Sequence, residues 1–278
     1  MINRTINKKI AIIFIIIMIA ITLFIILFPI YWLISLSFKL PVDAFSIPPK
    51  LLFNPTFSHF QEIWNDGDFQ SAFLNSLIIA FSSVALSLLI GVPAAYALSR
   101  HKFKFRRTFL LGILTTRLIP PMIFVIPYFI GFKFLGLLDT RIGLMLIYTQ
   151  FNLAMVVWGM WTYFDEIPIA LEESARIDGA SIFQGFYKIV LPLSAPGTAA
   201  TGVLCFLLAW NEFLYALLLT DIKARTLPIA ILNFIAYEGA NWGKVAAGAV
   251  FLMIPVVIFG VLFRRFLAAG LMGGGIKG

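Results

Sequence analysis

Charged side chains are scarce in this chain of 278 residues, of which only 12% are Asp, Glu, Lys or Arg. Soluble domains carry about 25% of such residues. Apolar residues make up 61% of the chain, and its mean hydropathy is +0.97. A soluble domain of this size would need far more polar surface than these residues supply. The composition therefore excludes a soluble globular domain and indicates a membrane protein.

Residue types that build disulfides, metal sites and catalytic centres are also few. The single cysteine, Cys205, lies inside an apolar run, which excludes a disulfide framework and a cysteine metal site within the chain. The two histidines, His59 and His101, lie in different predicted loops without the spacing of zinc ligands. The sequence contains no G-x-S-x-G or H-E-x-x-H motif and no ATP-binding G-x4-G-K-[ST] motif. We therefore predict no catalytic residue, no metal site and no cofactor bound by this chain.

The net charge of +8 is carried by basic residues at the ends of apolar runs, with no separate basic domain. This distribution is typical of membrane topology signals and not of nucleic-acid binding. We expect no nucleic-acid partner.

Six apolar stretches are each long enough to cross a bilayer, which takes about 20 residues. The first exceeds the apolar core of a signal peptide, about 7–15 residues, and no small-x-small cleavage site follows it before Pro41. We therefore expect an uncleaved first helix. The predicted membrane helices are about 10–35, 71–98, 109–132, 141–163, 193–219 and 245–266.

Basic residues predict the direction of these helices. The connection 99–108 carries five Lys or Arg residues, and both ends of the chain are basic, so the positive-inside rule places all three in the cytoplasm. The acidic, proline-rich segment 36–70 then lies outside, and 164–192 lies inside although it is slightly acidic. The predicted fold class is an all-α membrane protein with six transmembrane helices and cytoplasmic N- and C-termini.

The segment 164–192 is predicted to form two short helices joined by a tight turn. Pro168 suits the first turn of a helix over 169–178, and Gly179 suits the left-handed position that ends it. Ser181 and Gln184 have the spacing of a capping box, which begins a second helix.

The first of these helices carries charge, and the second carries a wide apolar face. Glu172 and Arg176 are four residues apart and can pair, which leaves Glu173 to face outward. The apolar face either lies against the ends of the membrane helices while the first helix meets a partner, or belongs to an ordinary interfacial amphipathic helix. Its members are Ile182, Phe183, Phe186, Tyr187, Ile189 and Val190.

The same segment resembles the EAA motif, E-A-A-x3-G-x9-I-x-L-P, of ATP-binding-cassette (ABC) importer permeases. Its spacing matches at every anchor, and Ser174 in place of the middle alanine is the one departure. The stretches "NSLIIAFSSVALSLLIGVPAAYALSR", "AWNEFLYALLLT" and "AAGLMGGGIKG" resemble the maltose-type branch of carbohydrate importer permeases, so that the resemblance covers nearly the whole chain.

The resemblance implies that 164–192 is a cytoplasmic coupling loop between membrane helices 4 and 5. Its coupling helix docks in a cleft of a cytoplasmic ATPase, where the glutamate of the motif pairs with a basic residue. The implied ATPase-coupling residues are Glu173, Ser174, Ala175, Asp178, Gly179, Ile189, Leu191 and Pro192. The tail 270–278 resembles one that reaches the paired ATPases, which implies contacts by Gly273, Gly274, Gly275 and Lys277; simple disorder of this tail is the alternative.

Polar groups within the membrane helices are candidates for a translocation pathway, because burying them in a bilayer is expensive. The candidates are Arg117, Asn211 and Glu212. Each either faces a polar pathway or pairs with another helix or with a partner permease. Trp158, Trp161, Trp210 and Tyr215 have rings that can stack on a sugar, by residue type alone.

The resemblance implies a single permease domain over 1–278, in the cytoplasmic (inner) membrane of a prokaryote. It implies that this domain takes a carbohydrate, a disaccharide or oligosaccharide, across by alternating access in binding-protein-dependent transport. The implied partners are a second permease subunit, two ATP-binding subunits that hold ATP and Mg, an extracytoplasmic solute-binding protein, and the sugar substrate. The alternatives are an ABC importer permease for another small solute and an ion-coupled secondary carrier that acts alone.

Overall fold

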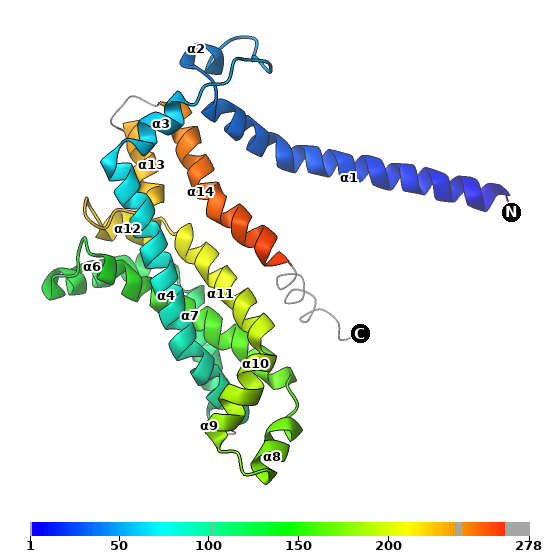
Figure 1. Cartoon of the computed structure of the whole chain (residues 1–278), viewed down its shortest axis with the longest axis vertical. Helices are drawn as coiled ribbons and strands as arrows, with labels where there is room; N and C mark the ends of the chain where they lie inside the picture. Colours follow the sequence, from blue (N-terminus) through cyan, green and yellow to red (C-terminus); the bar gives the residue numbers. More distant parts are fainter. Residues whose placement is uncertain (1, 102, 237–240, 265–278) are drawn as a thin grey trace. The chain divides into compact units, whose positions relative to one another are not determined.

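The computed structural model describes residues 2–101, 103–236 and 241–264, and all regular secondary structure in these ranges is helical (Figure 1). The all-α prediction is therefore confirmed for the described part of the chain. In chain order the elements are α1 (Ile2–Ser37), α2 (Pro41–Ala44), α3 (Ser58–Trp64), α4 (Gly67–Arg100), α5 (Arg106–Leu118), α6 (Met122–Leu135), α7 (Arg141–Glu166), α8 (Ala170–Ile177), α9 (Ile182–Gly185), the π-helix η1 (Phe186–Val190), α10 (Leu191–Leu193), α11 (Ala195–Trp210), α12 (Leu214–Leu219), α13 (Leu227–Ala236) and α14 (Trp242–Leu262).

Within the described residues, four helices are long and apolar enough to cross a membrane, and the number of candidate spans rises to six if each of two bent helix pairs is one span. Within a bilayer a helix satisfies its own backbone hydrogen bonds, which is why such apolar runs fold in this way. The prediction of several membrane-spanning helices is confirmed. The four continuous spans are Ala11–Ser37, Gly67–Arg100, Arg141–Glu166 and Trp242–Leu262.

The predicted helix over 109–132 is not continuous. Its first part ends at Leu118, its second part begins at Met122, and the two helices lie at 91°. Ile119 is extended, with φ −73° and ψ 126°, because the ring of the following proline disfavours the helical conformation at the residue before it. The prolines at 120 and 121 therefore end α5, and the stretch predicted as one membrane helix over 109–132 forms a bent pair of helices.

The predicted helix over 193–219 is also interrupted. α11 ends at Trp210, and a separate short helix, α12, begins at Leu214. At the other end, the bent pair Ile182–Leu193 and Ala195–Trp210 meets at 71°. Interrupted helices of this kind are tolerated in membrane proteins where their freed backbone groups find other partners.

The described residues form two compact units, one from 2–66, 231–236 and 241–253 and the other from 67–101, 103–230 and 254–264. In the first unit the ring of Phe60 packs against Phe38 and Phe251, with ring centroids 5.0 and 6.0 Å apart. The carbonyl oxygen of Lys39 accepts a hydrogen bond from His59 Nε2 at 3.0 Å. His59 is buried in α3, so its expected position in a loop is wrong. The sequence prediction of one permease domain over 1–278 stays a prediction.

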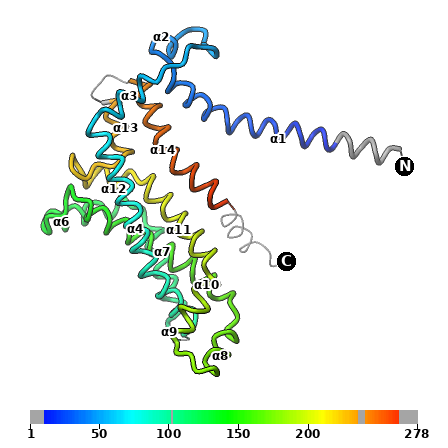
Figure 2. The backbone as a smooth tube through the Cα atoms, viewed as in Figure 1, coloured from blue at the N-terminus to red at the C-terminus, as the bar shows by residue number. Residues whose placement is uncertain are grey.

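In the second unit α4, α7 and α11 pack side by side (Figure 2). A side chain at Gly91 would lie 2.7 Å from Val156 Cγ1, so only glycine allows this approach of α4 to α7. Ser87 is fully buried and donates to the carbonyl oxygens of Ser83 and Thr149. Small residues at such an interface let membrane helices approach closely.

Candidate functional site

The turn that follows α8 has the backbone geometry that its sequence predicts. Gly179 has φ +88°, a left-handed conformation that glycine adopts without strain. Its amide donates to Arg176 O at 3.0 Å, and the amide of Ala180 donates to Ala175 O at 2.9 Å. These two bonds form a Schellman motif that satisfies the last carbonyls of the helix. The prediction that Gly179 ends the first helix is confirmed.

The next helix begins with the predicted capping box. Ser181 Oγ accepts from the amide of Gln184 at 3.3 Å, and Gln184 Oε1 accepts from the amide of Ser181 at 2.8 Å. Both bonds satisfy amides that have no partner within the first helical turn. Local hydrogen bonds therefore fix the backbone from the end of α8 to the start of α9.

The second helix is less regular than predicted, because it passes into η1 at Phe186. The amide of Leu191 donates to the carbonyl of Phe186, five residues earlier, and Pro192 has no amide to donate. The predicted wide apolar face is accordingly split. Phe186 and Val190 are buried, whereas Ile182, Phe183 and Tyr187 are exposed.

Glu172 is buried at the base of α8, with 2% of the residue exposed. Tyr96 Oη donates to Glu172 Oε2 at 2.5 Å, and Arg100 Nε donates to Glu172 Oε1 at 2.6 Å. Arg100 Nη1 and Nη2 donate to the carbonyl oxygens of Phe164 at 2.8 Å and Ile167 at 3.1 Å. The carboxylate thus joins α8 to the last turns of α4, and Arg100 joins both to the end of α7. We call Tyr96, Arg100 and Glu172 the Glu172 cluster.

The predicted pairing of Glu172 with Arg176 is wrong. Arg176 is exposed and makes no ion pair among the described residues, whereas the carboxylate of Glu172 points the other way, into the Glu172 cluster. Sequence reasoning had assigned Arg100 to membrane topology and overlooked Tyr96, which lie 72 and 76 residues from Glu172. A tyrosine four residues before an arginine at the end of an apolar run is the local signal for such a site, but it does not identify the partner.

The predicted ATPase-coupling residues mostly lie on the surface of 164–192. The residues Glu173, Ser174, Asp178, Gly179 and Pro192 are exposed, whereas Ala175, Ile189 and Leu191 are partly buried. No other described residue pairs with the carboxylate of Glu173. Ser174 donates to Ala170 O at 2.8 Å, so its hydroxyl is satisfied within α8.

A hollow of about 340 Å³ adjoins the turn after α8, and three predicted coupling residues, Asp178, Gly179 and Ile189, line it. Its lining residues are Asp178, Gly179, Ala180, Gln184, Lys188 and Ile189. The tail residues Gly273, Gly274, Gly275 and Lys277 lie outside the described residues.

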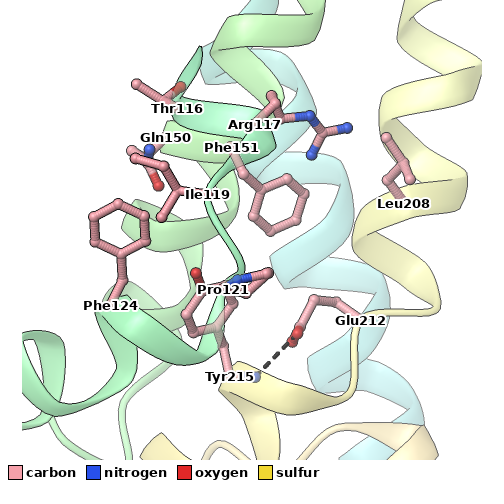
Figure 3. Close-up of a pocket in the computed structure, with 10 residues that line it drawn as sticks. All are labelled: Thr116, Arg117, Ile119, Pro121, Phe124, Gln150, Phe151, Leu208, Glu212 and Tyr215. Atoms are coloured by element: carbon pink, nitrogen blue, oxygen red, sulfur yellow. Dashed lines mark hydrogen bonds between the residues drawn. The ribbon is translucent and has the colours of Figure 1, made fainter. Parts of the chain in front are cut away.

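Two of the three pathway candidates line one cavity of about 170 Å³ beside the breaks after α5 and α11 (Figure 3). Arg117 lies 5.8 Å from the centroid of the Phe151 ring, and within the described residues it makes no ion pair. Asn211 does not line the cavity, because its side chain is exposed and donates to Leu207 O at 2.8 Å. The lining residues are Thr116, Arg117, Ile119, Pro121, Phe124, Gln150, Phe151, Leu208, Glu212 and Tyr215.

Glu212 holds the broken helix together while it lines the cavity. Its carboxylate accepts hydrogen bonds from the amides of Tyr215 at 3.0 Å and Ala216 at 3.2 Å, at the start of α12. It also accepts one from Tyr148 Oη, on α7, at 2.7 Å. Glu212 therefore pairs with another helix, as one alternative predicted, while its place on a translocation pathway stays a prediction.

The four aromatic candidates also differ in whether they line the cavity. Tyr215 lines the cavity, whereas Trp210 is buried with 1% exposure and stacks on Phe206. Trp158 is exposed, and Trp161 packs against the buried cluster around Leu98. Of the four rings, Tyr215 is the one that lines this cavity.

The chain matches one protein family and is similar over most of its length to known proteins. Residues 87–271 match the family described as binding-protein-dependent transport system inner membrane component. The chain is 36% identical to the trehalose transport system permease protein SugB of Mycobacterium tuberculosis, over 91% of this chain and 93% of that protein. It is also 36% identical to the trehalose/maltose transport system permease protein MalG of Thermococcus litoralis, over 91% of this chain and 92% of that protein.

A solved structure has the same fold. It is a chain of a bacterial ABC transporter involved in the import of the acidic polysaccharide alginate, with a TM-score of 0.76 and 25% identity, over 93% of this chain and 97% of that one. A second structure, at 20% identity and a TM-score of 0.68, is a bacterial alginate ABC transporter in complex with an alginate pentasaccharide-bound periplasmic protein. The fold of the chain is therefore that of an ABC importer permease.

Proposed function

The chain belongs to the family of binding-protein-dependent transport system inner membrane components, and we propose that it is the permease subunit that carries a carbohydrate through an ATP-driven importer. The observation that supports the carbohydrate is the match, over 91% of the chain, to relatives named for trehalose and trehalose/maltose transport. It is a multi-pass membrane protein of this family and is not itself catalytic. Family membership does not favour an ion-coupled carrier that acts alone.

The proposed assembly contains a second permease subunit, two ATPase subunits that bind ATP and Mg, and an extracytoplasmic solute-binding protein. The presence of a periplasmic protein with its sugar ligand in a structure of the same fold supports the last of these partners. The chain itself supplies membrane helices, with both termini and the segment 164–192 in the cytoplasm.

The proposed contact with an ATPase is the exposed side of α8 and the turn that follows it. Glu173 is exposed and its carboxylate has no ion-pair partner among the described residues, and the hollow lined by Asp178 and Gly179 adjoins the turn that follows α8. A basic side chain in an ATPase cleft would form an ion pair with Glu173. The coupling loop drives transport only if this docked contact stabilises one state of the permease more than the other. The tail 270–278 is proposed to make a further ATPase contact.

The proposed translocation pathway passes the cavity between Arg117 and Glu212 (Figure 3). A guanidinium, a carboxylate and the Gln150 amide can hydrogen-bond sugar hydroxyls, while the rings of Phe151 and Tyr215 offer apolar faces. The helix breaks on either side of the cavity are suited to alternating access, because interrupted helices line the pathways of many transporters.

Reconstitution of the complete complex tests this function. The permease pair, the ATPases and the binding protein in liposomes should take up labelled trehalose or maltose only when ATP is supplied. A second set of liposomes, with a proton or sodium gradient and this chain alone, should show no uptake. Uptake of polyamine or phosphate but of no sugar in a solute panel would contradict the proposed substrate class.

A further inference from the structure

We propose that the Glu172 cluster is the joint through which movement of the coupling loop reaches the membrane helices, with Arg100 and Tyr96 as positioning residues for the loop. This inference rests on the proposed function, because it concerns how ATPase binding at α8 acts on α4 and α7. It adds two residues outside the EAA motif to the transport mechanism.

The hydrogen bonds of the cluster leave almost no freedom at the joint. Both oxygens of the Glu172 carboxylate accept a bond, one from Tyr96 and one from Arg100. Three nitrogens of Arg100 donate, one to Glu172 and two to the backbone at the end of α7. A planar guanidinium used at all three nitrogens fixes three elements in one orientation.

Burial makes this joint strong. The side chains of Arg100 and Glu172 are 8% and 3% exposed, so water does not compete for their hydrogen bonds. Separating the two charges would leave each one buried without its partner, which is strongly unfavourable. The cluster is therefore expected to move as one body when the loop moves.

Adjacent aromatic rings extend the joint to the second helix of the loop. The ring of Phe186, in η1, lies 4.6 Å from that of Tyr96 and 6.4 Å from that of Phe164. Tyr96 and Phe164 lie 5.8 Å apart in an edge-on contact. Both halves of the loop thus contact the same ends of α4 and α7.

The two neighbouring glutamates of α8 face opposite ways, so one helix carries both the proposed ATPase contact and the attachment to the membrane helices. Glu173 is exposed toward the proposed ATPase, and Glu172 is buried against α4 and α7. A push on Glu173 is therefore applied one residue away from the point where the helix is held. No flexible segment separates the two.

The test measures solute taken up per ATP hydrolysed by the reconstituted complex of all its subunits. Glu172→Gln removes the charge with little change in volume and should lower this ratio roughly three- to tenfold, in the range of coupling changes seen for single residues. ATPase binding should stay near the wild-type level, because Glu173 is retained. Asp165→Asn is the matched control, since Asp165 forms an exposed ion pair with Arg106 at 3.2 Å nearby, and it should leave the ratio unchanged.

A double-mutant cycle distinguishes a joint from two independent sites. Arg100→Gln should lower the ratio at least as much as Glu172→Gln does, because it also removes the two bonds to the end of α7. The double variant should lose no more than Arg100→Gln alone, because both changes break the same pair. If the losses multiply, the two residues do not act together and the proposal is overturned. An unchanged ratio in Glu172→Gln also overturns it.

Two further measurements distinguish failure of this proposal from failure of assembly and from failure of the proposed function. Tyr96→Phe removes one hydroxyl only and should lower the ratio about twofold; this variant carries the test if Glu172→Gln fails to assemble. A wild-type ratio in an assembled Tyr96→Phe complex would contradict the proposal. The wild-type complex tests the proposed function separately, because absence of ATP-driven sugar uptake there refutes that function and not the joint.

Discussion

Two carboxylates in the second unit are held in contrasting ways, although both lie where helices are interrupted. Glu172 pairs with Arg100 in a buried cluster, so its charge is neutralised by a neighbour. Glu212 makes no ion pair among the described residues; backbone amides and the Tyr148 hydroxyl hold it at the wall of a cavity. A charge neutralised inside the chain is suited to a rigid joint, whereas one held by dipoles alone still acts electrostatically on a solute in the cavity.

In the proposed function, the loop transmits force from the ATPase and the cavity passes the solute. Variants of the loop should therefore change coupling and ATPase binding, and variants of the cavity should change the dependence of uptake on solute concentration. The first two variants below, at Glu173 and Arg117, each affect one region and should leave the other intact.

Glu173→Lys should have the largest effect. Reversal of this exposed charge places two cations together at the proposed ATPase contact, so ATPase binding and sugar uptake should fall to background while the chain still inserts in the membrane. Pull-down of the ATPase and uptake in liposomes measure both. Glu166→Lys, an exposed reversal outside the motif, is the control and should retain uptake. Normal transport by Glu173→Lys would refute the coupling role of α8.

Arg117→Met should affect the cavity without affecting the loop. Loss of the guanidinium removes a charged hydrogen-bond donor from the cavity wall, which should raise the KM for sugar uptake about tenfold while ATPase binding is unchanged. Lys133→Met, on the exposed side of α6, is the matched control. A normal KM in the Arg117 variant would place the pathway elsewhere.

Glu212→Gln should mainly lower stability. The amide keeps one oxygen acceptor where the carboxylate had two, so one of the bonds from Tyr148, Tyr215 and Ala216 is weakened or lost. The melting temperature of the purified chain in detergent should fall by roughly 5–10 °C. Asn211→Ala is the control, because this side chain bonds only within its own helix. An unchanged melting temperature would show that Glu212 does not hold α12 in place.

The sequence predicted the local structure of the coupling loop, but it did not predict which residues hold the loop against α4. Gly179, Ser181 and Gln184 act through hydrogen bonds to backbone within a few residues, so sequence spacing alone indicates the turn and the capping box. The partner of Glu172 could not be predicted in this way. Arg176 and Arg100 both had a suitable charge, and only the packing of α4 against the loop selects Arg100.

For the membrane helices, too, the sequence predicted the elements better than their arrangement. Apolar runs predicted long apolar helices, whereas the runs alone do not give the 91° bend after Leu118, which depends on the prolines at 120 and 121. Prolines inside apolar runs have different outcomes in this chain: Pro93 lies within the continuous α4. The difference depends on whether neighbouring groups can satisfy the freed carbonyls, which spacing does not reveal.

The smallest effect is expected at Asp139, which lies between α6 and α7, outside both regions. Its carboxylate accepts hydrogen bonds from four successive backbone amides, those of 221–224, at 2.9–3.3 Å. Partial burial by itself would raise the pKa of Asp139, but these four amide donors outweigh it, and the pKa is lowered. The bonds favour the ionised form, so they should stabilise the fold most strongly when Asp139 is charged.

A pH series on Asp139→Asn tests this account. Since the folded-state pKa lies below the unfolded value, about 3.9, the stabilisation is complete above that value and is lost as the pH falls through the folded-state pKa. At pH 7 the variant should melt roughly 2–5 °C below the wild type, and this difference should shrink toward zero at acid pH. Asparagine tolerates the positive φ of 51° at this position, so the backbone is not strained by the change. Sugar uptake at pH 7 should be unaffected, because neither the coupling loop nor the cavity is altered; a difference in melting temperature that persists unchanged at acid pH would show that charge is not what holds 221–224 in place.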